Sequence, residues 1–421
     1  MHRSVMCGML AAAVFSSSCR GAEAPPGGTV PASTPQPSAW AVKLEPLTLP
    51  ATGVTSQPQM TVSARGLILS WMEQRDANFT LKFAERSGAA WSQPVTVASS
   101  TDWFVSNADV PTVMRMSDGT LVATTYPATD LRLEAYELRL SYSRNDGKTW
   151  AVPVSPHHDG TKTQHGFATL FELPNRNLGL IWLDGRDQEL NTTDPQGGSM
   201  ALYYASFDPK WKQTAEALVN PRVCECCQTA VATTDDGAVV AFRDRSPREI
   251  RDINVTRLEQ DKWTPERPLH VDGWEIDACP VNGPALSARG RSVAAAWFTV
   301  KNDTGQAFAA FSADAGRTWG EPIRLDDGVA TGHVDIEMLE DGSAAATWVE
   351  FADQHSQFRM RRVSPSGARS NSIVVVGQGS SRVSGYPRIA RQGDDLVLAW
   401  TEGAGDGGDT QVKGAIARIP K

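Results

Sequence analysis

SADAGRTW, at residues 312–319, is the stretch of this sequence that decides the fold. The carboxylate of Asp314 is placed to accept backbone N–H groups of a tight turn, Gly316 suits the left-handed conformation, and Trp319 can pack between strands. The octapeptide therefore predicts a closed hairpin turn between two antiparallel strands. Its role is to lock the fold, and we expect no chemistry from its side chains.

The same pattern recurs along the chain. SRNDGKTW at residues 143–150 matches it, with Asn145 in the aspartate position and Gly147 and Trp150 in the glycine and tryptophan positions. Two degenerate copies are RSGAAW at residues 86–91 and SFDPKW at residues 206–211. Recurrence of one turn predicts a repeat architecture.

A short apolar strand that ends in an aromatic residue also repeats, at intervals of about 55 residues. A turn signal such as Asp236-Gly237 precedes each copy, and two further strands follow. Four antiparallel strands per repeat make a propeller blade, so the sequence predicts an all-β fold with a single β-propeller of seven blades, and six as the alternative. The seven aromatic residues are Trp71, Tyr126, Trp182, Phe242, Trp297, Trp348 and Trp400.

The two ends of the repeat region complete each other. The last repeat stops after its third strand, at residues 411–419, and VKLEPLTL at residues 42–49 has no blade of its own. We therefore expect the N-terminal segment to supply the missing outer strand and to close the ring.

The turn octapeptides match the Asp-box pattern S-x-D-x-G-x-T-W, and the chain resembles the sialidase (BNR or Asp-box repeat) superfamily across residues 41–421. The resemblance implies a β-propeller. For sialidases it also implies three arginines on the substrate carboxylate, an Asp acid/base and a Tyr–Glu nucleophile pair. The chain departs from that pattern, because QPQMTVSA at residues 57–64 lacks the Phe/Tyr-Arg-Ile-Pro motif of the first sialidase blade. Residues 386–389 (YPRI), in the last blade, contain the residues of that motif only in a different order. The blade count also departs from the family, because sialidase propellers have six blades and this chain has seven repeats.

The N-terminus predicts export. Residues 1–19 read as a signal peptide with a lipobox, in which Cys19 is lipidated, with simple cleavage after the small residues as the alternative. Residues 20–40 are rich in Pro, Ala, Ser and Gly and predict a disordered tether. We expect a monomer in the bacterial cell envelope, at the outer membrane or the periplasmic face, that meets the membrane only through its lipid anchor. A net charge of −8 argues against nucleic acid as a partner.

Strand order places the Asp boxes on one rim of the ring. The loops that join second to third strands, and one blade to the next, lie on the other rim, where we expect the site. Five carboxylates there follow the repeated aromatic residue by two positions, so they share a face and either form an acidic ring near the axis or pair with arginines and cap loops. These are Glu73, Asp184, Asp244, Glu350 and Glu402.

The blade-four loop RDRSPREIRD at residues 243–252 places four arginines among carboxylates. They can clamp an anionic ligand or satisfy one another in an ion-pair network. The candidate ligand-binding residues are Arg186, Arg243, Arg248, Arg251 and Arg388. If the protein is a hydrolase, the resemblance implies Asp184 or Asp244 as acid/base and Tyr386 with Glu402 or Glu350 as nucleophile.

Four cysteines flank the same blade. Cys224, Cys226 and Cys227 lead into blade four, and Cys279 leads into blade five. The residues leave three interpretations open: a disulfide from Cys279 to one of the other three, a thiolate site for copper or zinc, and a catalytic thiol. For the last of these, His157, His158 and His165 approach from another inter-blade loop.

These observations predict an exported envelope propeller that binds an acidic glycan or a protein partner through the rim around blade four. An exo-sialidase-like hydrolase of acidic sugars and a thiolate metal protein are the alternatives.

Overall fold

The computed structural model describes residues 40–130, 132–188, 199–377, 382–403 and 409–419. The predicted signal peptide, Cys19 and nearly all of the predicted tether lie outside these residues. Secondary structure in the described ranges consists of strands, and no helix there is long and apolar enough to cross a membrane.

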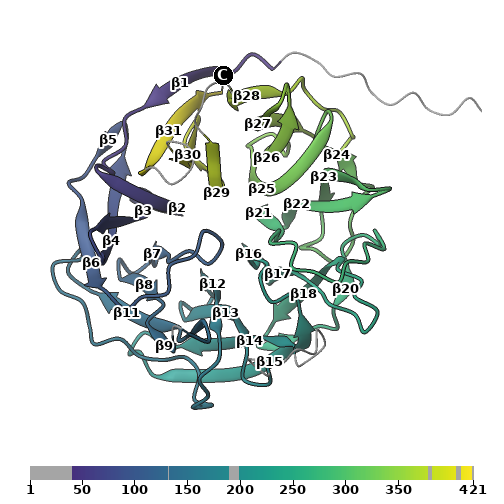
Figure 1. Cartoon of the computed structure of the whole chain (residues 1–421). Helices are drawn as coiled ribbons and strands as arrows, with labels where there is room; N and C mark the ends of the chain where they lie inside the picture. Colours follow the sequence, from purple (N-terminus) through teal and green to yellow (C-terminus); the bar gives the residue numbers. More distant parts are fainter. Residues whose placement is uncertain (1–39, 131, 189–198, 378–381, 404–408, 420–421) are drawn as a thin grey trace, which may run out of the picture. The chain divides into compact units, whose positions relative to one another are not determined.

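Seven antiparallel sheets form a ring of seven blades, which confirms the predicted count (Figure 1). Blade one contains β2 (Val54–Ser63), β3 (Gly66–Arg75), β4 (Asn78–Ser87), β5 (Ala90–Trp91) and β6 (Val95–Ser100). Blade two contains β7 (Val113–Arg115), β8 (Leu121–Thr125) and β11 (Arg139–Ser143), with the ribbon β9 (Ala128–Asp130) and β10 (Ala135–Tyr136) inserted before β11. Blade three contains β12 (His165–Glu172), β13 (Leu178–Asp184), β14 (Met200–Phe207) and β15 (Gln213–Val223).

The remaining blades follow the same order from the axis outward. Blade four contains β16 (Ala230–Thr234), β17 (Gly237–Arg243), β18 (Ile253–Glu259), β19 (Lys262–Trp263) and β20 (Arg267–Pro268). Blade five contains β21 (Ala285–Arg289), β22 (Ser292–Lys301), β23 (Thr304–Ser312) and β24 (Ile323–Arg324). Blade six contains β25 (Val329–Met338), β26 (Ala344–Ala352), β27 (His355–Val363) and β28 (Ile373–Val376). Blade seven contains β29 (Arg382–Gln392), β30 (Asp395–Gly403), β31 (Thr410–Arg418) and β1 (Lys43–Leu47).

The N-terminal strand closes the ring as predicted. β1 pairs antiparallel with β31, from Lys43 opposite Arg418 to Leu47 opposite Gly414. The chain thus begins and ends its propeller in one sheet, which leaves no unfinished blade edge.

The core lies between neighbouring blades rather than inside any one of them. The second strand of a blade is covered on both faces, and for that reason β13 and β17 are buried along their whole length and read as continuous apolar runs. One cluster joins Trp348 of blade six to Phe298 of blade five, and another joins Trp182 of blade three to Tyr126 of blade two. Each large side chain buried in this way stabilises the fold by about 1.5–3 kcal/mol.

The two complete Asp boxes, in blades two and five, each pack against the preceding blade. Asp314 accepts hydrogen bonds from the Thr318 backbone N–H at 2.9 Å and from the Ser312 hydroxyl at 2.7 Å. Gly316 has φ of 76°, and a Cβ there would lie 2.9 Å from Val239 of blade four. Glycine is therefore needed both for the backbone conformation and for close packing of blade against blade.

The second box has the same geometry with an amide in place of the carboxylate. The Thr149 N–H donates to Asn145 Oδ1 at 3.0 Å. Trp150 packs edge-on against Phe83 of blade one, with ring centroids 6.3 Å apart.

Candidate functional site

A central cavity of ≈ 650 Å³ runs along the propeller axis and is lined from every blade. Its walls are the innermost strands, β2, β12, β16, β21, β25 and β29, together with residues just before β7 (Figure 1). This cavity lies within the volume range of small-molecule sites, about 300–1,000 Å³.

The innermost strands enter the cavity through bulges. The pairing register shifts near the start of β2, β12, β25 and β29. In three of these bulges Gln57, Phe167 and His333 have φ of 56°, 54° and 51°, in the left-handed region. Bulges of this kind re-aim side chains at the ends of strands, and here they occur together at one mouth of the cavity.

Arg388 of β29 is a cation that lines the cavity. Its Nε–H is buried without a hydrogen-bond partner among the described residues, and its guanidinium lies 5.7 Å from the centre of the Tyr386 ring. The Tyr386 ring in turn stacks on His333 at 4.5 Å. Asp335, on β25 of the neighbouring blade six, accepts the backbone N–H groups of Ile389 and Ile336. Burial raises the pKa of Asp335, and the charge of Arg388 opposes that increase.

Other charged groups in the cavity leave a positive balance. Burial raises the pKa of Glu337 to about 8, with Asp335 adding to the increase and Arg391 and Arg289 opposing it. Burial likewise raises the pKa of Asp109 to about 7. When both acids hold their protons, the three guanidinium groups of Arg289, Arg388 and Arg391 face only the carboxylates of Asp335 and Glu340.

The other arginines predicted to clamp a ligand have different surroundings. Arg186 binds both oxygens of Asp184 at 2.9 and 2.8 Å and lies 3.9 Å above the Tyr203 ring. Arg251 bonds Glu249 and Glu225 within the blade-four loop. These residues form the ion-pair network that was the alternative to a clamp.

Within the described residues, Arg243 and Arg248 neither line the cavity, as Arg388 does, nor form the carboxylate pairs of Arg186 and Arg251. Arg243 is 2% exposed and donates to three backbone carbonyl oxygens, those of Asn282 at 2.7 Å, Phe298 at 2.7 Å and Arg251. Arg248 is exposed on the loop tip. Of the five predicted arginines, Arg388 alone lines the central cavity.

The five carboxylates that follow the repeated aromatic residue do not line this cavity. Asp184 and Glu350 each accept the indole N–H two positions before them, from Trp182 and Trp348, both at 2.8 Å. Glu73 pairs with Lys82 at 2.8 Å. The acidic ring near the axis is therefore wrong, since none of the five lines the cavity and three of them are held by indole or lysine partners.

The implied Tyr–Glu nucleophile pair is not assembled in the described residues. The Tyr386 hydroxyl donates to the carbonyl oxygen of Val281, Glu350 is bound to Trp348, and Glu402 lines a separate groove beside β1 and β31. Burial raises the pKa of Asp244 to about 6, with Glu266 adding to the increase. Asp244 is not among the residues that line the cavity.

The four cysteines come together beside the cavity mouth. A disulfide joins Cys226 to Cys279, which confirms the predicted link from Cys279 to the blade-four loop. Cys224 and Cys227 are buried thiols, 1% and 2% exposed. Burial raises the pKa of Cys224. Burial also acts on Cys227, but its hydrogen bond with Cys224 and the charge of Arg243 outweigh it and lower the pKa.

Sequence analysis named His157 and His165 only as possible partners of a catalytic thiol, whereas the structure pairs both with Asp159. His157 Nδ1 and His165 Nε2 lie 3.0 and 3.2 Å from the same Asp159 oxygen, and the rings stack at 3.8 Å. The remaining ring nitrogens are buried without partners. A metal-bound imidazole needs an acceptor for its second N–H, so this set suits two neutral imidazoles that donate to Asp159 better than a metal. Burial and the neighbouring His165 lower the pKa of His157 to about 4, in line with a neutral ring.

Four charged cavity residues that the sequence analysis missed could have been found from the alternation of polar and apolar residues along the innermost strands. Asp335 and Glu337 alternate with buried residues along β25, and Arg289 and Arg391 end their innermost strands. Alternation on the first strand of a blade would have placed them at the axis.

Comparison with known proteins identifies the fold. No protein-family model and no curated protein sequence matches the chain. Among solved structures, the phage phi92 endosialidase aligns with 91% of this chain and 70% of its own, at 9% identity and a TM-score of 0.50. A Hadza microbial sialidase aligns with 70% of this chain and 63% of its own length, at 16% identity and a TM-score of 0.45. A six-bladed fucose-recognising lectin of Aleuria aurantia covers 78% of this chain at 10% identity and a TM-score of 0.42. At such identities the likeness shows a sialidase-like β-propeller fold and nothing further.

Proposed function

We propose that this seven-bladed, sialidase-like propeller binds an anionic ligand in its central cavity, with an acidic glycan as the ligand class and Arg388 as the main charge contact. The observation that carries the proposal is the state of Arg388, a cavity-lining guanidinium whose buried Nε–H has no partner in the described part of the chain. The N-terminal segment predicts the cell envelope as the compartment.

A bound anion would accept the hydrogen bond that the Arg388 Nε–H does not make within the described residues. A buried polar group without a hydrogen bond is costly, and guanidinium groups bind carboxylate or sulfate with two parallel hydrogen bonds. The positive balance of the cavity when Glu337 and Asp109 are protonated adds to the attraction.

The rest of the cavity suits a polyhydroxylated ligand. Gln59, Thr61 and Gln228 line the same space as Arg388 and can bond sugar hydroxyls. Behind the guanidinium, the Tyr386 ring stacks on His333 and supports Arg388 from outside the cavity lining.

We propose binding rather than sialidase-type hydrolysis, because the residues that the resemblance implies for hydrolysis are engaged elsewhere. Glycoside hydrolysis needs two carboxyl groups, or a Tyr–Glu pair, facing one substrate bond. Asp184 and Glu350 are held by indoles, and Tyr386 is held by Val281.

Calorimetric titration with N-acetylneuraminate, glucuronate and a sulfated monosaccharide, against neutral lactose, tests the proposal. We expect at least one acidic sugar to bind, and the Arg388→Gln variant to bind it about 10- to 100-fold more weakly, because a charged hydrogen bond contributes about 1.5–3 kcal/mol. Arg186→Gln is the matched control, because Arg186 already bonds Asp184, and it should keep the wild-type affinity. Equal affinity in the Arg388→Gln variant, or no binding of any acidic sugar, would contradict the proposal.

A further inference from the structure

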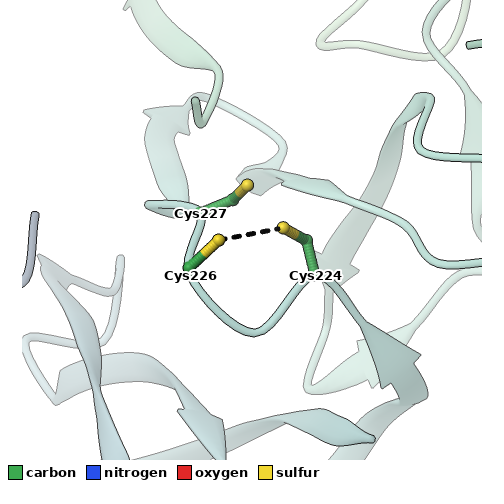
Figure 2. A group of neighbouring side chains, drawn as sticks. All are labelled: Cys224, Cys226 and Cys227. Atoms are coloured by element: carbon green, nitrogen blue, oxygen red, sulfur yellow. Dashed lines mark hydrogen bonds between the residues drawn. The ribbon is translucent and has the colours of Figure 1, made fainter. Parts of the chain in front are cut away.

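Three cysteine side chains of the loop into blade four point toward one another (Figure 2). The sulfurs of Cys224 and Cys226 lie 3.8 Å apart, and those of Cys224, Cys226 and Cys227 all lie within 4.8 Å of one another. Cys279 brings the fourth sulfur from the loop into blade five, as the disulfide partner of Cys226. Two loops separated by a whole blade therefore deliver every cysteine of the described chain to one point.

The sulfur spacing fits ligands of one ion. Thiolates bind zinc at about 2.3 Å in a tetrahedron, which sets neighbouring sulfurs about 3.8 Å apart. The Cys224–Cys226 distance equals that edge, and Cys227 needs to move by less than a bond length to reach it.

Arg243 brings a buried positive charge to the cysteine cluster, and its guanidinium lies 4.9 Å from the centre of the Trp274 ring. It is 2% exposed, it bonds only backbone carbonyl oxygens, and no carboxylate of the described residues forms a salt bridge with it. Carbonyl oxygens carry only partial negative charge, so the guanidinium keeps a net positive charge beside the cluster. That charge is of the sign that complements thiolate ligands of a bound ion.

The cysteine loop is held from outside by an ion-pair network. Glu225, between Cys224 and Cys226, pairs with Arg245 and with Arg251, the latter at 3.3 Å. Arg245 and Arg251 are held in turn by Glu249 at 2.9 and 2.8 Å. A loop fixed in this way keeps its sulfurs in place without the disulfide, as a preorganised metal site requires.

We propose that Cys224, Cys226, Cys227 and Cys279 together bind one thiophilic metal ion, Cu(I) or Zn(II), once the Cys226–Cys279 disulfide is reduced. An external dithiol supplies the reduction: its two sulfurs give two electrons and two protons to Cys226 and Cys279 and close their own disulfide. The four thiols then release their protons as the ion binds. In the disulfide form only Cys224 and Cys227 remain as ligands.

The burial of Cys224 and Cys227 argues for metal binding rather than for thiol–disulfide exchange with another protein. Cys224 and Cys227 are at most 2% exposed, so the disulfide of another protein cannot reach them, whereas a single ion can. The site is also distinct from Arg388, so its failure and that of the glycan proposal are separate outcomes.

The test uses the full chain, purified under nitrogen with and without dithiothreitol and offered one equivalent of Zn(II) or Cu(I). After desalting, we expect about one ion per reduced chain and less than about a tenth of that in the oxidised chain, with an X-ray absorption spectrum of sulfur neighbours at about 2.2–2.3 Å. Cys224→Ser and Cys227→Ser should each weaken binding about 10-fold or more in competition with a chromogenic chelator.

Two further variants keep the test decisive. Cys19→Ser removes a cysteine that is not one of the four proposed ligands and should leave one ion per chain. Cys279→Ser abolishes the disulfide and keeps three sulfurs, so it should bind the ion without any reductant. A reduced, folded wild-type chain that retains no ion overturns the proposal, as does equal retention by a folded Cys227→Ser variant or a second disulfide that joins Cys224 to Cys227.

Discussion

The hydroxyl of Tyr386 donates a hydrogen bond to the carbonyl oxygen of Val281, a residue 105 positions earlier in the chain. Tyr386 belongs to the innermost strand of blade seven, and Val281 follows Cys279 in the loop into blade five. This bond joins β29, the strand that carries Arg388, to the loop that carries one of the four cysteines. The two proposed sites therefore share one structural support.

Tyr386→Phe should lower stability by about 1–3 kcal/mol, because it leaves the Val281 carbonyl oxygen unpaired in a buried place. The urea midpoint, followed by tryptophan fluorescence, measures the loss. Tyr142→Phe is the control, since Tyr142 stacks on Trp211 and its hydroxyl has no hydrogen bond in the described residues, and it should change stability by less than about 0.5 kcal/mol. Equal effects of the two variants would show that the Tyr386 bond contributes nothing.

Affinity for an acidic sugar should fall as the pH rises through about 8. Burial raises the pKa of Glu337 to about 8, so this acid is neutral below that pH and adds a negative charge to the cavity above it. Asp335, Arg289 and Arg391 are the charged groups that face it. Titrations at pH 6 and pH 9 measure the change, and Glu337→Gln should bind with less dependence on pH than the wild type.

A pH-independent affinity in the wild type would contradict this assignment of Glu337. Asp109, whose pKa burial raises to about 7, adds a smaller change in the same direction. The Asp109→Asn variant separates the two contributions.

Asp314→Ala should destabilise the fold by about 1–2 kcal/mol, because the Thr318 backbone N–H loses its acceptor. Asp314→Asn should cost less, since Asn145 already makes the equivalent bond in blade two. Burial opposes ionisation of Asp314, but the Thr318 hydrogen bonds outweigh it and lower the pKa to about 2. The contribution of its charge is therefore present above about pH 4 and lost as the pH falls through 2. Urea midpoints of the three proteins at pH 7 and pH 3 check the order.

Local sequence patterns were enough to predict the fold. They predicted only some of the residues of the candidate site. Seven aromatic strands, the Asp-box turns and the unpaired segment at residues 42–49 predicted the blade count and the ring closure, and both are confirmed. The same reading placed Arg388 and the cysteines as candidates. It expected Arg388 and Arg243 at comparable loop positions and did not separate them, whereas the structure places Arg388 within β29 and Arg243 at the end of β17.

The sequence by itself determined that this chain is a seven-bladed propeller closed by its N-terminal strand, because strand alternation and turn chemistry depend on residues within a few positions of one another. Only the tertiary structure decided which charges are already balanced. Arg243 meets carbonyl oxygens 39 and 55 positions away, whereas the Nε–H of Arg388 has no hydrogen-bond partner among the described residues. The partners of a buried charge come from neighbouring blades, and their positions exist only once the ring has formed.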